Sequence, residues 1–214
     1  MKWLIAFDLD GTLAESKRPL SEDMAAILAR LLAITDVAVI SGGDWPQFEK
    51  QIASRLPAGV ALDRLWLMPT TGTKLYRFIN GAWRAVYAEL FDDAEKAKIR
   101  TAFDQALTDA GLAPRAREGS AYHTLRAKLP ELSINLGGTT SIDVTRAGID
   151  KGYGLKRLSA ESGVPLDGML FIGDAIFPGG NDYPAAEIGL DTVRVRDVAE
   201  TPAVVTAIIA CLHR

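Results

Sequence analysis

The sequence predicts an α/β fold, in which a Rossmann-like core with a parallel sheet is interrupted by a small inserted α+β domain. Two observations predict the core. Short continuous apolar runs alternate with amphipathic helical patterns before residue 70, and the same alternation resumes after Lys151. A third observation predicts the insert, because the pattern changes between these two parts. A chain of 214 residues is long enough for one domain with a smaller one inserted in it.

The first part of the core reads as strand, helix, strand, helix, strand. Apolar runs of four or five residues are typical of strands buried on both faces, and the connecting helices imply right-handed crossovers. Ser21 precedes two acidic residues and a series of apolar residues spaced three and four apart, which predicts a capped amphipathic helix. The predicted elements are a strand at 3–7, a helix from Ser21 to Leu32, a strand at 37–40, a helix at 46–56 and a strand at 65–68.

The pattern of the insert begins after a predicted hairpin. Asn80-Gly81 between two strand-like runs is a strong signal for a tight hairpin turn. The segments that follow are a helix at 92–110 and short alternating runs at 121–144 that predict antiparallel strands. After Lys151 come a helix to about Ser162, strands at 169–172 and 192–195, and a last helix from Thr201. We therefore expect a discontinuous core at 1–86 and 147–214 and an insert at 87–146.

Composition excludes several classes of protein. With 48% hydrophobic and 24% charged residues, the chain is not a disordered tail, and a net charge of −3 does not predict nucleic acid or an anionic membrane as a partner. One cysteine, Cys211, excludes an internal disulfide framework, and its apolar neighbours predict that it lies in the core. No run approaches the roughly 18 apolar residues of a membrane span, and no targeting segment is visible. We expect a cytoplasmic protein.

The first chemical motif is Asp8-Leu9-Asp10-Gly11-Thr12-Leu13, directly after the first predicted strand. Ligands of open α/β sheets bind beyond the carboxyl ends of the strands, which is where Asp8 lies. Two carboxylates this close repel unless a cation compensates, and Mg²⁺ prefers oxygen ligands. Asp8 is then a candidate nucleophile for phosphorus, and Asp10 a candidate acid and base. An ordinary Asp/Gly turn with a capping role is the alternative.

Three further segments supply what a phosphate group needs. Asp174 follows another predicted strand, and Asn181 and Asp182 in the glycine-rich loop after it are candidates for bonding metal-bound water or orienting Lys151. Ser41, with the amides of Gly42 and Gly43, offers donors at a third strand end. Lys151 offers a positive charge for a phosphoryl group. Each segment alone has a simpler interpretation: a surface turn, a turn serine or a solvated lysine.

These four segments, in this order, resemble the haloacid dehalogenase superfamily of Mg²⁺-dependent phosphotransferases. Residues 7–13 match its first motif, Ser41 its second, Lys151 its third, and 173–182 its fourth. The insert is similar to the type 2 cap of subfamily IIB. The resemblance implies that Asp8 is the nucleophile, Asp10 the acid/base, and Ser41 and Lys151 phosphate contacts. The acids expected around Mg²⁺ are Asp8, Asp10 (through its backbone carbonyl), Asp174 and Asp182.

Within that subfamily the sequence is similar to the eukaryotic-type phosphomannomutase family. Residues 137–144 and the loop 178–182 carry this similarity. It implies that Ser141 and Asp143 contact substrate and that Lys17 or Arg18 binds phosphate. The Arg-Asn-Gly-Met-Leu-Asn type segment of the mutase cap is absent, and Ser41 stands where the mutases usually have glycine. The candidates to replace the cap arginines, or to be solvated surface residues, are Arg115, Arg117 and Arg126.

The sequence therefore predicts a Mg²⁺-dependent phosphatase that acts on a small phosphorylated metabolite, most simply a sugar phosphate. A hexose phosphomutase shares the aspartyl-phosphate chemistry and differs in the acceptor. A binding domain without activity is the third interpretation, and the retained pair of close carboxylates argues against it. The oligomeric state is left open.

Overall fold

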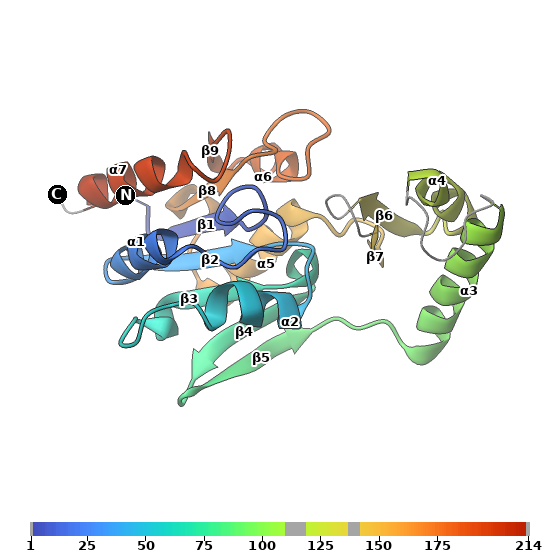
Figure 1. Ribbon diagram of the computed structural model, residues 1–214, viewed down its shortest axis with the longest axis horizontal. Helices are drawn as coiled ribbons and strands as arrows, with labels where there is room; N and C mark the ends of the chain where they lie inside the picture. The colour runs from blue at the N-terminus through green and yellow to red at the C-terminus, as the bar shows by residue number, and fades with distance from the viewer. Residues whose placement is uncertain (1, 110–118, 137–141, 213–214) are drawn as a thin grey trace. The chain divides into compact units, whose positions relative to one another are not determined.

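The computed structural model describes residues 2–109, 119–136 and 142–212, and the chain divides into two compact units. The core unit comprises Met1–Ala88 and Asp150–Arg214, and the inserted unit comprises Glu89–Ile149. Both are drawn in Figure 1, where the colour follows the chain from blue to red. Among the described residues, no helix combines the length and the apolar character needed to cross a membrane.

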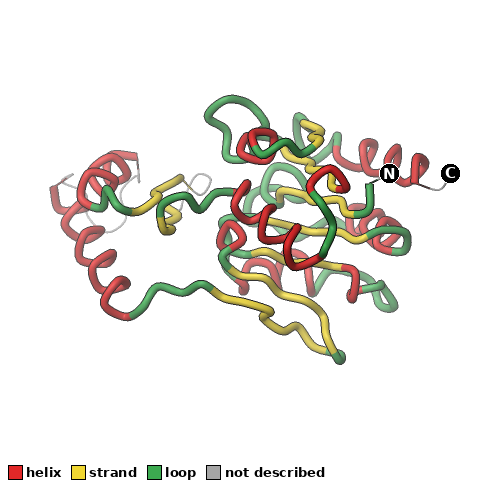
Figure 2. The backbone as a smooth tube through the Cα atoms, turned by 180° about the vertical axis from the view of Figure 1, so that it is seen from behind, coloured by secondary structure: helices red, strands yellow, loops and turns green. Residues whose placement is uncertain are grey.

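The core unit is built on one seven-stranded sheet, which confirms the predicted α/β class. The strands, in sheet order, are β5 (Ala82–Ala88), β4 (Lys74–Ile79), β3 (Leu65–Met68), β2 (Asp36–Ile40), β1 (Leu4–Asp8), β8 (Met169–Gly173) and β9 (Asp191–Arg194). The strands from β3 to β9 run parallel, whereas β4 and β5 form an antiparallel hairpin at one edge. Figure 2 shows this hairpin with its tight connecting turn.

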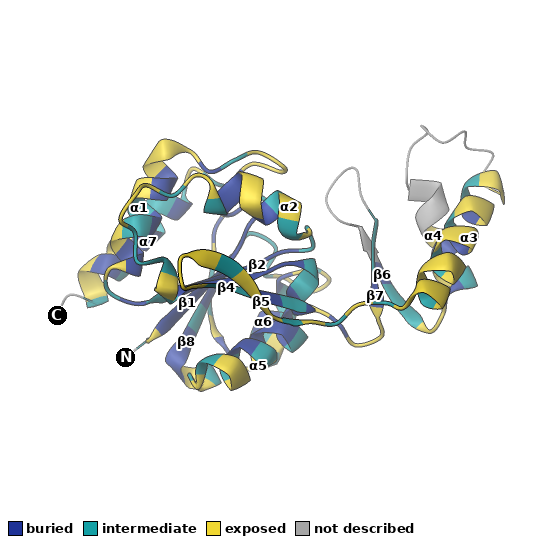
Figure 3. Cartoon of the chain, turned by 90° about the horizontal axis from the view of Figure 1, so that it is seen from below, coloured by how far each residue is buried: buried dark blue, intermediate teal, exposed yellow. Residues whose placement is uncertain are grey.

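Helices cover both faces of the sheet, because each central strand sends alternate side chains to opposite sides. Ile5 and Phe7 pack on the face covered by α1 (Glu22–Leu32) and α7 (Thr201–Leu212). Leu4 and Ala6 pack on the other face, with α5 (Lys151–Ser162) and α6 (Tyr183–Glu187). In Figure 3 the central strands are dark blue and the outer sides of the helices are yellow. Two-sided burial explains why the central strands read as continuous apolar runs.

Local signals fix the ends of several elements, and the Ser21 cap and the Asn80-Gly81 turn lie where they were expected. The Ser21 hydroxyl accepts a hydrogen bond from the Met24 N–H and caps α1. Asn80 and Gly81 both have positive φ, at 51° and 78°, which is the backbone that a two-residue hairpin turn requires. Asp150 caps α5 by accepting from the Tyr153 N–H at 2.8 Å. Of the elements that these short-range interactions fix, α5 carries a candidate site residue, Lys151.

Three expectations were wrong in detail. The helix expected at 46–56 is a short α-helix, α2 (Trp45–Phe48), that continues as a π-helical turn, η1 (Glu49–Ala53). Strands were expected from residue 121, but α4 (Gly119–Lys128) is helical, because Leu125 and Leu129 lie one helical turn apart and bury one face. Cys211 is exposed, since it lies on the outer side of α7.

The inserted unit has its own small core. Helices α3 (Asp93–Asp109) and α4 pack against the hairpin of β6 (Leu132–Leu136) and β7 (Ile142–Arg146). Its buried residues are Ala102, Ala106, Leu125, Leu129 and Ile134. Arg146 ties the start of the unit to its end: it donates to the Leu90 carbonyl, pairs with Glu95 and lies over the Phe91 ring.

Candidate active site

The carboxyl ends of three neighbouring strands bring the first motifs together. Asp8 is the last residue of β1 and pairs in register with Ile40 of β2, so Ser41 lies one residue beyond it. On the other side Phe7 pairs with Ile172 of β8, which places Asp174 beyond the end of that strand. The parallel register therefore gathers residues that lie up to 166 positions apart in the sequence at one edge of the sheet.

A buried lysine joins two of the acids. Lys151 is 3% exposed, and its Nζ donates to Asp8 Oδ1 at 2.6 Å and to Asp182 Oδ1 at 2.5 Å. It is the first residue of α5, whose N-terminus is fixed by the Asp150 cap. The other oxygen of Asp182 accepts the Ala175 N–H at 3.0 Å. Asp182 thus holds both the ammonium group and the loop that follows β8.

The charges of this cluster are not balanced. Burial raises the pKa of Asp8 to about 7, Lys151 opposes this rise, and repulsion from Asp182 adds to it. Burial disfavours the Lys151 ammonium, but attraction to Asp8 and Asp182 outweighs it and raises the pKa of the lysine. One ammonium faces two buried carboxylates, so a further cation would favour the ionised form of Asp8.

The donor set around Asp8 fits such a cation. Asp8, Asp174 and Asp182 each offer a carboxylate oxygen, and these oxygens lie within 4.8 Å of one another. Both oxygens of Asp182 already accept hydrogen bonds, whereas the carboxylate of Asp174 accepts only the Thr12 hydroxyl among the described residues. A Cβ at Gly11, where φ is +91°, would lie 2.7 Å from Asp174 Oδ2, so glycine leaves room for this carboxylate. All-oxygen ligands of this kind suit Mg²⁺.

The Asp10 carboxylate is held apart from this trio. Its Oδ1 accepts the Lys17 N–H at 2.8 Å and the Gln51 amide at 3.4 Å, and its Oδ2 accepts the Gln47 amide at 3.0 Å. Both glutamines come from the α2–η1 segment that follows the Ser41 loop. Asp10 therefore lies beside Asp8 in sequence, and its carboxylate faces a separate set of donors.

The loop after β2 is pinned by a left-handed turn. Ser41 is 5% exposed and its carbonyl accepts the Thr71 N–H at 2.9 Å, while the Gly43 carbonyl accepts the Thr70 N–H at 2.8 Å. Thr70, Thr71 and Gly72, which form η3 (Thr70–Gly72), have consecutive positive φ values of 51°, 58° and 82°. Positive φ is unusual for a β-branched residue, so this turn is a strained element beside a candidate phosphate loop.

The other predicted substrate contacts are more scattered. Lys17 and Arg18 are exposed in the loop before α1, and Asn181 is exposed in the loop after β8. Asp143 is half-buried on β7 of the inserted unit. Arg126 is exposed on α4, whereas Ser141, Arg115 and Arg117 lie outside the described residues. Gly42 lies between Ser41 and Gly43 in the pinned loop.

Three residues in contact with the acids were missed by sequence reasoning. Thr12 is fully buried and donates to Asp174 Oδ1 at 3.3 Å, while its carbonyl accepts the Thr201 hydroxyl. Thr12 stands in the first motif but had been given no role. For Gln47 and Gln51 the sequence offers one signal of a shared role: they lie four residues, about one helical turn, apart in the segment after the Ser41 loop.

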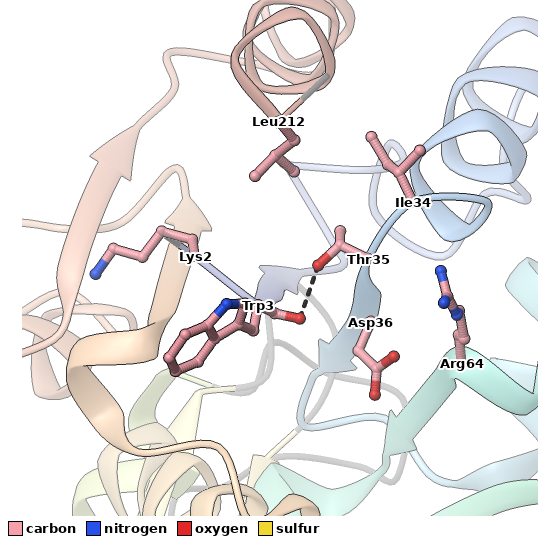
Figure 4. A pocket seen from close by; sticks show the side chains of 7 residues that line it. All are labelled: Lys2, Trp3, Ile34, Thr35, Asp36, Arg64 and Leu212. Carbon is pink, nitrogen blue, oxygen red and sulfur yellow. Dashed lines mark hydrogen bonds between the residues drawn. The ribbon is translucent and has the colours of Figure 1, made fainter. Parts of the chain in front are cut away.

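A shallow hollow of about 170 Å³ lies at the opposite, amino ends of the strands. Figure 4 shows its lining and the hydrogen bond that Thr35 donates to the Trp3 carbonyl at 2.7 Å. Its one carboxylate, Asp36, already accepts the Trp66 indole N–H. The lining residues are Lys2, Trp3, Ile34, Thr35, Asp36, Arg64 and Leu212. The strand-end carboxylates, and not this hollow, therefore form the candidate site.

The sequence is similar to those of phosphomannomutases. The eukaryotic phosphomannomutase family matches residues 115–211. The phosphomannomutase of Saccharomyces cerevisiae is 25% identical over 238 aligned residues, which cover 93% of this chain and 89% of the relative. The phosphomannomutase of Schizosaccharomyces pombe is 24% identical over 221 residues, which cover 85% and 84%.

Solved structures of other proteins share the architecture of this chain. The structure of Plasmodium falciparum IMP-nucleotidase matches with a TM-score of 0.75 and 16% identity, over 99% of this chain and 69% of that one. SMU.1108c from Streptococcus mutans UA159 matches with a TM-score of 0.70 and 15% identity, over 98% and 100%. At these identities the likeness establishes a shared fold.

Proposed function

We propose that this chain, which has the haloacid dehalogenase fold and a sequence similar to phosphomannomutases, is a Mg²⁺-dependent phosphatase that passes through a phospho-Asp8 intermediate. The similarities themselves support a phosphatase or a phosphomutase of that fold. The proposal of a phospho-Asp8 intermediate is carried by the buried Asp8 carboxylate, which lies 2.6 Å from Lys151 Nζ, with Asp174 beside it and Asp10 two residues away. The proposed substrate is a small sugar phosphate.

The reaction divides into two displacements at phosphorus. In the first, an oxygen of Asp8 attacks, the bond from phosphorus to the sugar oxygen breaks, and Asp10 in its acid form protonates the leaving oxygen. In the second, water attacks phospho-Asp8 and gives its proton to the Asp10 carboxylate, so that phosphate leaves and Asp8 is restored. The sum is phosphate ester plus water to alcohol plus inorganic phosphate.

The other residues bind and orient the phosphoryl group. Lys151 supplies positive charge beside the attacking oxygen, and Ser41 with the Gly42 amide supplies donors for the phosphoryl oxygens. Asp8 and Asp174, with the Asp10 carbonyl, would hold Mg²⁺, which when bound neutralises charge on the phosphoryl group. Asp182 then acts by positioning Lys151. Lys17, Arg18, Asn181, Ser141 and Asp143 remain proposed contacts for the rest of the substrate, and the inserted unit the proposed cap.

Phosphate release from a panel of sugar phosphates, with and without Mg²⁺, tests the proposal. Asp8→Asn keeps the size of the side chain and removes the nucleophilic charge, so turnover should fall by more than about 10⁴-fold, beyond the usual contribution of acid–base help. Asp167→Asn, an exposed aspartate outside this edge of the sheet, is the matched control. A Mg²⁺-independent activity, or an Asp8→Asn variant that keeps one part in a hundred of turnover, would refute the assignment.

A hexose phosphomutase is the second candidate, and the similarity to two phosphomannomutases over most of the chain favours it. A mutase must also anchor a second, distal phosphate, for which forked arginine contacts are well suited. The arginine-containing segment of the mutase cap is absent from this sequence. The guanidinium group of Arg146 already donates hydrogen bonds to the Leu90 carbonyl and the Glu95 carboxylate. These two facts favour water as the acceptor.

The acceptor is tested with mannose 1-phosphate and a catalytic amount of mannose 1,6-bisphosphate. We expect free sugar and inorganic phosphate as the main products, followed by ³¹P NMR. Conversion to the 6-phosphate faster than phosphate release would establish the mutase and refute hydrolysis as the main activity.

A further inference from the structure

The Asp10 carboxylate has a donor on each oxygen, and two of its three donors among the described residues are side-chain amides. Gln47 Nε2 reaches Oδ2 at 3.0 Å, and Gln51 Nε2 lies 3.4 Å from Oδ1, which also accepts the Lys17 N–H. Amides carry no charge of their own, so they orient a carboxylate without neutralising it. An amide also offers both N–H donors and a carbonyl acceptor to a neighbouring carboxyl group.

The backbone brings both amides to Asp10 from one helical segment. Gln47 and Gln51 are four residues apart, and the π-helical bond from the Ser54 N–H to the Glu49 carbonyl, at 2.9 Å, widens the turn just there. π-Turns inside helices occur frequently at functional sites. Gly43 makes room for the first amide, because a Cβ there would lie 2.3 Å from Gln47 Oε1. The segment thus has two local features that accommodate this contact.

Gln51 is held in place at a cost to stability. It is 1% exposed, its Nε2 donates to the Arg18 carbonyl at 2.5 Å, and no donor among the described residues reaches its Oε1. A buried acceptor without a partner is unfavourable. Turning the amide over would give Oε1 no relief, since it would then face the Arg18 carbonyl and Asp10. The amide is therefore fixed with its donors toward the acid.

We propose that Gln47 and Gln51 are positioning residues that aim the Asp10 carboxyl group at the oxygen of the leaving group. Gln51 donates to Oδ1 of Asp10, and Gln47, which is less buried, donates to Oδ2, so the plane of the carboxyl group is set from both sides. This inference rests on the proposed function, because it assigns a role within the two displacements described above. In the first, Asp10 gives its proton to the sugar oxygen as the phosphorus–oxygen bond breaks. In the second it takes one from water.

The proposal predicts a dependence on the leaving group that a structural role would not produce. Gln47→Met keeps the length of the side chain and removes both its donor and its acceptor. A sugar alkoxide needs a proton in order to leave, whereas nitrophenolate does not. The value of kcat/KM reports only steps up to formation of phospho-Asp8. We expect kcat/KM to fall at least about 30-fold for a sugar phosphate and to stay within about threefold for p-nitrophenyl phosphate.

A second readout follows from the same variant. With p-nitrophenyl phosphate the first displacement proceeds, but attack of water on phospho-Asp8 lacks an aligned base. Rapid mixing should therefore show a burst of nitrophenolate in Gln47→Met, followed by a slow steady state. Gln51→Met should behave alike, which keeps the test open if one variant does not fold. Lys50→Met, an exposed change in the same segment, is the matched control and should leave both substrates unchanged.

The outcomes separate this inference from the proposed function. Equal losses on both substrates without a burst, or no loss on either, would overturn the positioning role and leave the phosphatase assignment intact. A wild-type protein without activity on any phosphate ester would overturn both. Selective loss on the sugar phosphate together with a burst supports the inference.

Discussion

Gly72 is a position in the core unit where an added methyl group would meet the backbone of another element. Its φ is +82°, and a Cβ there would lie 2.5 Å from the Cα of Gly154 in helix α5. Gly154 is three residues beyond Lys151, and Thr71 N–H, one residue before Gly72, donates to the Ser41 carbonyl. The substitution Gly72→Ala therefore pushes the helix that carries the lysine away from the turn that pins the phosphate loop.

The free-energy cost has two parts. An alanine in the left-handed region costs roughly 1–2 kcal/mol, and forcing a methyl group into backbone that cannot move away costs roughly 1–3 kcal/mol more. The free energy of unfolding should fall by about 2–5 kcal/mol, which for a chain of this size lowers Tm by about 4–20 °C. Gly81→Ala is the matched control, because Gly81 has a φ of +78° with open space around it and should lose only the first part.

Thermal unfolding of both variants, followed by circular dichroism, measures the difference. We expect Gly72→Ala to lose about 1–3 kcal/mol more than Gly81→Ala, and sugar-phosphate turnover to fall at least about tenfold in Gly72→Ala alone. Equal losses of Tm in the two variants would show that the backbone at Gly154 moves away without a loss of stability. The close approach of Gly72 and Gly154 would then have no role in holding the site.

Further expectations follow from the charges and caps. Because burial raises the pKa of Asp8 to about 7, Mg²⁺ affinity measured by calorimetry should rise with pH and be roughly 30-fold weaker at about pH 5.5 than at about pH 8; a flat profile would contradict this. In the metal-free protein the free energy of unfolding should instead fall as the pH rises. The stabilisation from the raised pKa of Asp8 is fully present below its ordinary pKa of 3.8 and is lost as the pH rises through about 7. Urea titrations across this range would detect the loss. Lys151→Met leaves Asp8 and Asp182 without their cation and should cost about 3–5 kcal/mol at neutral pH, whereas a loss below 1 kcal/mol would mean that the cluster relaxes. Ser21→Ala should cost about 1 kcal/mol in thermal unfolding, and Ser21→Thr should restore most of it.

The parts of the fold that follow from short-range patterns were predictable. Strands at 37–40 and 65–68, the Asn80-Gly81 hairpin and the helix from Lys151 to Ser162 are where apolar runs, turn residues and caps indicate. Each of these signals lies within a few residues of the element that it specifies. The helix at 119–128 was missed because its apolar positions are few and their burial depends on packing against α3.

The candidate site divides in the same way. The strand-end acids are visible in the sequence because each motif follows a buried strand, and the parallel register brings the motifs together. That Asp10 faces two glutamines, and that Asp182 has both oxygens occupied, depends on side-chain directions across segments about 40 and 31 residues apart. No local pattern encodes such contacts, and the widened turn at Glu49–Ala53 further obscures them.

The inserted unit ends at Ile149, so that one residue, Asp150, separates it from Lys151 at the start of helix α5. Asp150, the first residue of the core unit after the insert, closes the first turn of α5 with its own side chain. Gly148, with a φ of +80° and open space around it, lies on the insert side of that cap. The first turn of α5 is therefore closed by a residue of the core unit itself. In evolutionary terms the insert is an exchangeable part: its sequence can change while the strand-end acids and Lys151 stay as they are.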